Sequence, residues 1–113
     1  MVAFKVEWSV EAQLDLSDIL EFYINRNGTS IYSKKLYSRI KKSIKLLSKH
    51  PFLGKLTEDA HVRALITGDY QIIYEVFDNL ILIIMIWDCN RAPEDKVINI
   101  RKTNRTIDTI PIF

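Results

Sequence analysis

Several cations and one tyrosine in the second half of the chain are the residues best suited to catalysis. They follow or occupy three consecutive predicted strands: Arg63, Tyr70, Arg91 and Lys96. In an antiparallel meander such side chains can converge on one side of the sheet. With His61 or Glu75 nearby, the set contains a base, an acid and cations for phosphate charge. RNA cleavage through the 2′-hydroxyl requires these groups.

The same residues also have a simpler explanation as ordinary strand-edge polarity, in which the arginines pair with nearby acids: Asp69, Asp88 or Glu94. A metal site has little support, because His50 and His61 lack the HExxH spacing and Cys89 is the one cysteine. The sequence contains no glycine-rich nucleotide motif and no GxSxG elbow. We therefore expect neither a metal nor an organic cofactor.

Charge is unevenly distributed, although the net charge is only +2. Residues 31–50 contain seven bases and no acid: Lys34, Lys35, Arg39, Lys41, Lys42, Lys45 and Lys49. Either this is a solvated helix face, or it attracts an anionic partner such as nucleic acid or an acidic protein segment. The candidate partner-binding residues come from this helix and from the meander: Lys34, Lys41, Lys45, Arg63, Arg91 and Lys96.

The hydrophobic pattern changes period halfway along the chain. The first half combines one alternating segment with two segments whose apolar residues recur every three or four positions. The second half consists of short apolar runs separated by turn signals, which predicts an antiparallel meander. The predicted strands are 3–8, 61–66, 70–77 and 80–87, and the predicted helices are 10–25, 31–48 and a short one at 94–102. The order β-α-α-β-β-β describes an α+β domain, with a helical hairpin packed on a small, mainly antiparallel sheet.

Local signals refine this outline. Ser9 and Ser30 stand in the N-cap positions of the two long helices, and Asn27-Gly28 predicts the turn between them. Asp15 lies in the middle of the first helix, where we expect its carboxylate to hold a neighbouring donor in a structural role. Strand 80–87 is apolar throughout, which is typical of a central strand covered on both sides.

Length and composition limit the class of protein. A chain of 113 residues, 48% hydrophobic and 27% charged, is expected to form one domain with a real core. We predict a domain over 1–103 and a C-terminal tail over 104–113. The longest apolar run is far shorter than the roughly 20 residues of a membrane helix, and no signal segment is evident. We expect no membrane association, and a single cysteine favours a reducing, cytoplasmic compartment.

An ordered set of residues over positions 3–97 resembles the RelE/ParE superfamily of bacterial toxin–antitoxin toxins, and ParE-like members more closely. Three segments carry the resemblance: WSVEAQLDLSDILEFYI, LLSKHPFLGK and VRALITGDYQIIYEVFDNLILIIMIWDCNRAP. It implies a toxin that inhibits growth, is neutralised by a cognate antitoxin protein and takes part in plasmid stabilisation. RelE-like members cleave mRNA in the ribosomal A site, whereas ParE-like members poison DNA gyrase.

The positions that serve mRNA cleavage depart from the RelE pattern. Aligned on it, four positions lack the expected lysines, arginine or tyrosine: Val62, Ala64, Gln71 and Val97. Arg91 matches a basic position, and a shift by one residue would bring Arg63 into the cluster. Valine and alanine cannot stabilise phosphate charge, so we expect a ParE-like toxin acting on DNA gyrase. The alternatives are a ribosome-dependent endonuclease acting on mRNA, and an inactive member that only binds its antitoxin.

Overall fold

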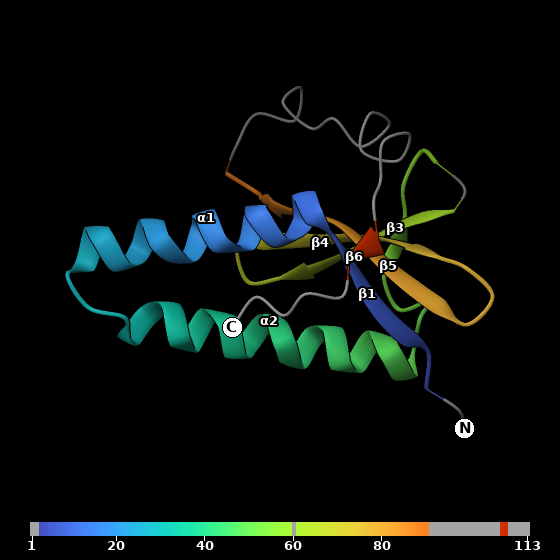
Figure 1. Ribbon diagram of the computed structural model, residues 1–113. Helices are drawn as coiled ribbons and strands as arrows, with labels where there is room; N and C mark the ends of the chain where they lie inside the picture. The colour runs from blue at the N-terminus through green and yellow to red at the C-terminus, as the bar shows by residue number, and fades with distance from the viewer. Residues whose placement is uncertain (1–2, 60, 91–106, 109–113) are drawn as a thin grey trace.

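The computed structural model describes residues 3–59, 61–90 and 107–108 (Figure 1). The helices are α1 (Val10–Asn27) and α2 (Ile31–Lys49). The strands are β1 (Lys5–Ser9), β2 (Lys55–Leu56), β3 (Val62–Thr67), β4 (Tyr70–Val76), β5 (Leu80–Asp88) and β6 (Ile107–Asp108). The four predicted strands and the two long helices are confirmed, with boundaries shifted by at most two residues. The short helix predicted at 94–102 lies outside the described residues.

The ends of α1 are defined by the residues that the sequence indicates. The Ser9 hydroxyl oxygen accepts a hydrogen bond from the Ala12 N–H at 3.1 Å, as an N-cap does. Gly28 has φ = 73°, a left-handed conformation that glycine adopts without strain, and its N–H donates to the Ile24 carbonyl. Ser30 occupies the N-cap position of α2 as expected, but it does not cap the helix with its side chain. Its backbone is not in the extended conformation of an N-cap, and its side chain makes no capping hydrogen bond.

Two serines fix α2 at its two ends. The Ser33 hydroxyl donates to the Leu20 carbonyl on α1 at 2.6 Å, and the Ser48 hydroxyl donates to the Phe4 carbonyl at 2.6 Å. The Phe4 N–H donates back to the Ser48 carbonyl at 2.8 Å. α2 is therefore tied to α1 at its start and to the chain entering β1 at its end. Neither helix of the described residues has the length and hydropathy needed to cross a membrane.

The strands form one sheet in the order β2-β3-β4-β5-β1-β6. β3, β4 and β5 make the predicted antiparallel meander, whereas β1 pairs with β5 in parallel. β5 is thus central, as its apolar sequence predicts, and every residue from Ile81 to Trp87 is buried. The sequence pattern does not indicate β2 or β6, because two residues carry no periodicity. β6 lies within the segment predicted as a tail and pairs antiparallel with β1.

The two faces of the sheet belong to different core clusters. On the helix face, both helices pack on β4 and β5 through seven buried residues: Ala12, Leu16, Leu20, Leu36, Ile40, Ile44 and Leu47. On the second face, the cluster consists of strand residues: Val62, Ile73, Leu82, Ile84, Met85 and Trp87. Alternation along the strands separates the two sets, so that Ile72 faces the helices and Ile73 faces away from them.

α1 is also bonded directly to β5. Relative to β4, the strand contains one extra residue at Ile84, which interrupts the ladder. The Ser9 hydroxyl donates to the Ile84 carbonyl at 3.2 Å, and the Asp15 carboxylate accepts the Ile86 N–H at 3.1 Å. These bonds satisfy backbone groups of β5 beyond the end of its pairing with β1. The expected contact of Asp15 with a neighbouring donor is therefore confirmed.

Candidate functional site

Arg63 holds the loop that leads from α2 into the sheet. Its Nη1 donates to the carbonyl oxygens of Phe52 at 3.2 Å and Gly54 at 2.8 Å. Its guanidinium also lies over the Phe52 ring, with the central carbon 5.1 Å from the ring centre. Tyr74 pairs with Arg63 across the ladder, donates to the Pro51 carbonyl and accepts the Gly54 N–H, each at 2.9 Å. Two polar side chains of the meander thus fix a single loop.

Gly54 is required because the loop passes too close to Tyr74 for a side chain. A β-carbon at this position would lie 2.7 Å from the Tyr74 hydroxyl oxygen and 3.0 Å from the Ala64 carbonyl oxygen. Burial raises the pKa of Tyr74, although the Gly54 hydrogen bond and the charge of Arg63 oppose that rise. Tyr74 is therefore a neutral hydroxyl at pH 7 that acts in packing the loop.

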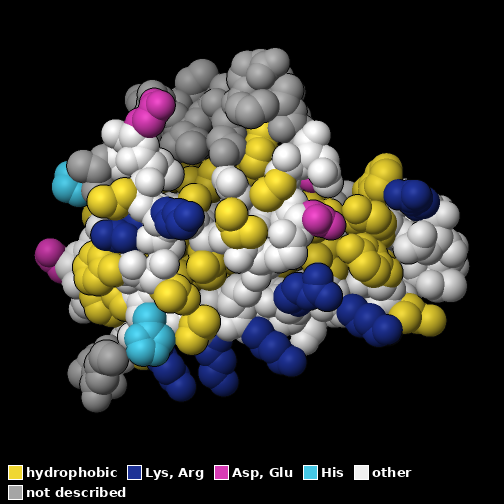
Figure 2. Space-filling view, turned by 180° about the vertical axis from the view of Figure 1, so that it is seen from behind, with side chains coloured by type: hydrophobic (Ala, Val, Ile, Leu, Met, Phe, Trp, Pro, Cys, Tyr) yellow, Lys and Arg dark blue, Asp and Glu magenta, His cyan; other side chains and the backbone are white. Residues whose placement is uncertain are grey.

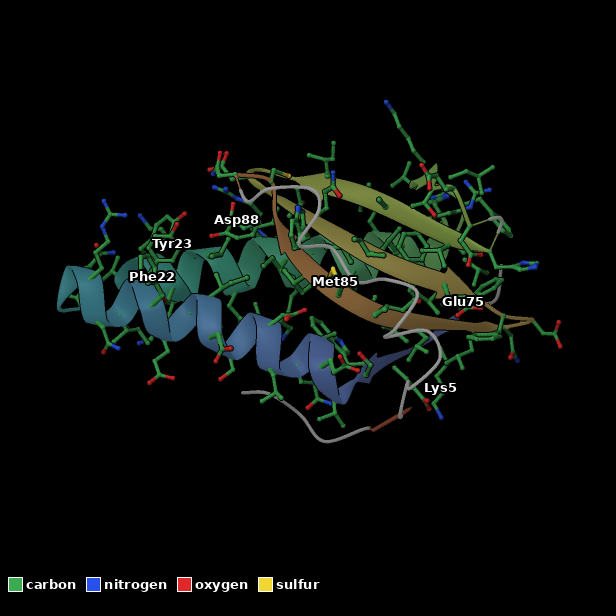
Figure 3. The ribbon with its side chains drawn as sticks, turned by 90° about the horizontal axis from the view of Figure 1, so that it is seen from above. Lys5, Phe22, Tyr23, Glu75, Met85 and Asp88 are labelled. Atoms are coloured by element: carbon green, nitrogen blue, oxygen red, sulfur yellow. The ribbon has the colours of Figure 1, made fainter. Side chains whose placement is uncertain are left out.

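Tyr70 lies in the core. It is 4% exposed, and its hydroxyl donates to the Tyr23 hydroxyl on α1 at 3.3 Å. The Tyr23 ring makes an edge-to-face contact with Phe22 (Figure 3), with ring centres 5.1 Å apart. It makes a second such contact with Tyr32, at 4.6 Å. Burial raises the pKa of Tyr70, and the Tyr23 hydroxyl and the Asp88 carboxylate raise it further. Tyr70 stays protonated at pH 7 and connects α1 to the meander.

The candidate catalytic residues are not brought together within the described chain. Arg63 pairs with Tyr74 in the β3–β4 ladder, whereas Tyr70 pairs with Thr67 at the other end. Four residue steps separate the two positions, which is about 13 Å at about 3.3 Å per residue. Arg91 and Lys96, the remaining members of the predicted set, lie outside the described residues.

The second face of the sheet carries apolar side chains where the RelE pattern has cations. Val62 is completely buried there, and Ala64 packs against the same cluster. Gln71 lies two positions before Ile73 on β4 and shares its orientation. Glu75, also on this face by alternation, is 5% exposed and is an acid. None of these positions supplies a cation for phosphate charge.

A pocket of about 560 Å³ lies where β3 begins and β4 ends. Its lining combines an imidazole and two carboxylates with apolar side chains: Phe52, His61, Glu75, Val76, Phe77 and Asp78. The structure thus brings together His61 and Glu75, which the sequence suggests as acid–base groups. It adds Asp78, which the sequence pattern indicates only as a turn residue. No cluster suited to a metal ion occurs among the described residues.

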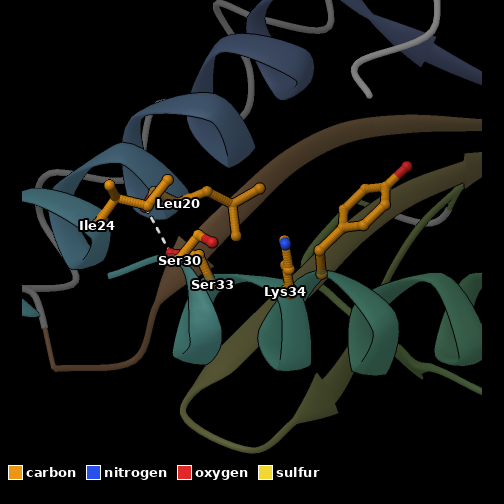
Figure 4. A pocket seen from close by; sticks show the side chains of 6 residues that line it. Leu20, Ile24, Ser30, Ser33 and Lys34 are labelled. Atoms are coloured by element: carbon orange, nitrogen blue, oxygen red, sulfur yellow. Dashed lines mark hydrogen bonds between the residues drawn. The ribbon is translucent and has the colours of Figure 1, made fainter. Parts of the chain in front are cut away.

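A groove of about 250 Å³ lies between the two helices (Figure 4). Leu20, Ile24 and Tyr37 give it apolar walls, and Lys34 borders it. Large apolar side chains are also exposed at this far end of the hairpin, including Phe22 at 56% and Ile31 at 63% (Figure 2). Sequence reasoning missed this surface. A helical wheel shows which residues of one helix lie outside its buried stripe, but it does not show which of them contact residues of the other helix.

The basic face of α2 is exposed, as predicted. All seven cations of residues 31–50 are exposed, among them the candidate partner-binding residues Lys34, Lys41 and Lys45. Within the described residues the one ion pair joins Lys5 to Glu7, at 3.0 Å. In that part of the chain the cations of α2 therefore have no acidic partner, and their role as a binding surface stays a prediction.

Comparison with known proteins shows which structures and which family this chain resembles. No curated protein sequence matches the chain significantly. Solved structures that share the fold include two toxin–antitoxin systems. "Chromosomal ParDE TA system from P. aeruginosa" has a TM-score of 0.67 and 22% identity, covering 78% of this chain and 98% of that one. "The crystal structure of the toxin-antitoxin complex RelBE2 (Rv2865-2866) from Mycobacterium tuberculosis" has a TM-score of 0.58 and 18% identity, covering 77% and 99%.

The sequence itself matches a family model over most of its length. The model describes the ParE toxin of the type II toxin–antitoxin system parDE, and it aligns with residues 6–93. This range contains both helices, all of β1 except Lys5, and the whole meander. The chain therefore belongs to the ParE toxin family of type II toxin–antitoxin systems, within the RelE/ParE superfamily.

Proposed function

We propose that this toxin inhibits growth by acting on DNA gyrase. The observation that carries the proposal is the apolar second face of the sheet. Cleavage of mRNA in the RelE manner needs cations on the strands to stabilise the charge that develops at phosphorus. Val62, Ala64 and Gln71 stand at those positions here. Inhibition of an enzyme by binding needs no such cluster, and this favours gyrase over the ribosome as the target.

Two assays with the purified toxin test the target. We expect inhibition of DNA supercoiling by gyrase at toxin concentrations that leave mRNA on purified ribosomes intact. Prior mixing with the antitoxin should abolish the inhibition. Codon-positioned cleavage of mRNA by the unmodified protein on ribosomes would overturn the proposal. Either target would place the toxin in the bacterial cytoplasm.

A cognate antitoxin is the second part of the proposal. Both solved structures described above are toxin–antitoxin systems, and the groove between α1 and α2 offers a suitable surface. An amphipathic segment could place apolar side chains against Leu20, Ile24 and Tyr37 and an acid beside Lys34.

The groove can be tested by a pair of matched substitutions on α1. Ile24→Asp puts a charge on the groove wall and should weaken antitoxin binding at least about tenfold. Leu14→Asp makes the same kind of change at an exposed α1 position outside the groove lining, and should leave binding unchanged. Equal effects of the two variants would argue against the groove as the antitoxin site.

One observation favours the ribosome-dependent endonuclease as a second candidate. The pocket at the start of β3 contains His61, Glu75 and Asp78, which can supply the base and the acid of 2′-hydroxyl cleavage. If RNA cleavage is observed, His61→Ala should abolish it without changing the melting temperature, because His61 is exposed. An inactive chain that only binds its antitoxin would show neither activity.

A further inference from the structure

The cations of α2 form a row along the helix. At 3.6 residues per turn, five lysines fall within an arc of about 100° on the side opposite the buried stripe. These are Lys34, Lys41, Lys42, Lys45 and Lys49. From first to last they span about 22 Å along the axis, at about 1.5 Å per residue. Figure 2 shows Lys and Arg side chains following one another along the edge of the molecule formed by α2.

The helix that carries the lysine row is held firmly in place. The hydrogen bonds of Ser33 and Ser48 hold the two ends of α2, and Ile40 and Leu47 beneath the row are completely buried. The helix therefore fixes the relative positions of the lysine stems before any partner arrives. Binding then orders only the lysine side chains, which limits its entropic cost.

The composition of the row distinguishes between kinds of anionic partner. The centres of protein–protein interfaces are depleted in lysine and rich in aromatic residues, whereas protein–DNA interfaces are strongly positive and polar. Beside the lysines, the exposed side chains include Ser38, Arg39 and a single large apolar residue, Leu46. Other exposed apolar side chains lie beyond the two ends of the row: Phe22, Ile31 and Tyr32 near the hairpin turn, and Phe52 and Leu53 after Lys49. Beside the row itself, the Tyr37 ring centre lies 5.4 Å from the Lys41 Nζ. The row therefore resembles a surface for phosphates more than one for an acidic peptide.

We propose that the lysine row of α2 binds the sugar–phosphate backbone of duplex DNA, independently of base sequence. Duplex DNA carries one negative charge per about 1.7 Å of its axis, counting both strands, so a stretch as long as the row contains about 13 phosphates in total. Lysine is a flexible point charge, which suits phosphate contacts and does not read bases. The choice of DNA over RNA rests on the proposed function, because gyrase works on bound duplex DNA. The row would hold the toxin against that DNA.

The test measures fluorescence anisotropy of labelled duplexes of about 20 base pairs, in two unrelated sequences, without gyrase present. We compare the unmodified toxin with Lys41→Gln/Lys45→Gln/Lys49→Gln. The matched control is Lys5→Gln/Arg26→Gln/Lys55→Gln, which removes the same charge from exposed positions off the row. Between about 50 and 200 mM salt, the slope of log K against log salt should be about −4 for the toxin. The row variant should lose about three units of that slope, and the control should lose less than one.

Several outcomes would overturn the proposal: no duplex binding, equal losses in the two triple variants, or a marked preference between the two sequences. Tighter binding of duplex RNA of the same length would refute the choice of DNA. A poly-glutamate peptide that competes as well as DNA would show that the row serves acidic proteins. Because the assay contains no gyrase, its failure leaves the supercoiling result untouched. If the toxin binds DNA but does not inhibit supercoiling, gyrase is refuted as the target and the DNA-binding proposal stands.

Discussion

On the helix face of the sheet, polar side chains extend to other parts of the fold. Arg63 and Tyr74 hold the loop after α2, and Tyr70 reaches Tyr23 on α1. On the second face the buried cluster is apolar and includes Leu82 of β5. Residues of catalytic type on the helix face are therefore engaged in structural contacts. On the second face, the described positions Val62, Ala64 and Gln71 carry no charge where the RelE pattern has cations. The difference directs the search for function to the surfaces of the helices.

The largest expected effect tests whether the second face is a true core. Leu82→Ala removes a completely buried side chain and should lower the free energy of unfolding by about 3 kcal/mol. Leu56→Ala, at a position 59% exposed on β2, is the control and should change it by less than about 0.5 kcal/mol. Chemical denaturation measures both. Similar values for the two variants would show that the second face is loosely packed.

The second prediction concerns the helix face. Tyr74→Phe leaves the Gly54 N–H and the Pro51 carbonyl without their shared buried partner, and should cost about 2 kcal/mol. Tyr70→Phe removes one longer hydrogen bond and should cost about 1 kcal/mol or less. Urea titrations of the two variants check the order. If Tyr70→Phe proved the more costly, the loop contact would not be the stronger polar support of this face.

High pH should lower the free energy of unfolding through the two buried tyrosines of the helix face. Burial raises the pKa of Tyr70 and Tyr74, so the native state keeps protons that the unfolded chain releases above about pH 10. The tyrosine contribution is complete below that pH and is lost as the pH rises toward the native pKa. Each tyrosine adds a slope of up to about 1.4 kcal/mol per pH unit. Unfolding free energies at rising alkaline pH should show a shallower decline in Tyr70→Phe, and an unchanged decline would contradict the assignment.

A smaller effect is expected where α1 meets β5. Asp15→Asn replaces a charged acceptor of the Ile86 N–H with a neutral one and should cost about 1 kcal/mol. Asp18→Asn, at an exposed position one turn further along, should be close to neutral. Growth inhibition should persist in both variants, because Asp15 acts in stability. Loss of toxicity with unchanged melting in Asp15→Asn would refute that role.

The smallest expected effect is none at all. Gln71→Arg places a cation on the second face at a position where the RelE pattern has an arginine. One cation among apolar neighbours does not assemble an acid, a base and a charge cluster, so we expect no mRNA cleavage on ribosomes. Gyrase inhibition should be unchanged. Codon-positioned cleavage in this variant would mean that the chain retains a dormant nuclease site.

Periodicity predicted most of the fold, because the helices and the long strands bury regular stripes. Leu36, Ile40 and Leu47 are all buried as their spacing indicates, and β5 is central as its composition indicates. The parallel pairing of β1 with β5 was not predicted. Residues 5–8 pair with residues 80–83, and a hydrophobic pattern carries no information about partners so distant in the sequence.

The candidate site was less predictable than the fold. Residue type and strand order suggested that Arg63 and Tyr70 converge, but register decides this, and it separates them along the ladder. Arg63 also donates to backbone carbonyls of the short α2–β2 connection, which no side-chain pattern encodes. Exposure of the α2 lysines followed from the helical period alone. The groove was not predicted, because it forms only where the two helices contact each other.

The attachment of β1 and α1 to β5 has a consequence for the order of folding. Besides the β1–β5 pairing, the Ser9–Ile84 and Asp15–Ile86 hydrogen bonds join residues 75 and 71 positions apart. Closing loops of this length costs chain entropy before the contacts return any stability. The helical hairpin and the β3–β5 meander involve local contacts and can form first. On the ribosome, the growing chain therefore cannot join β1 to the meander until β5 has emerged, and until then β1 remains an unpaired strand.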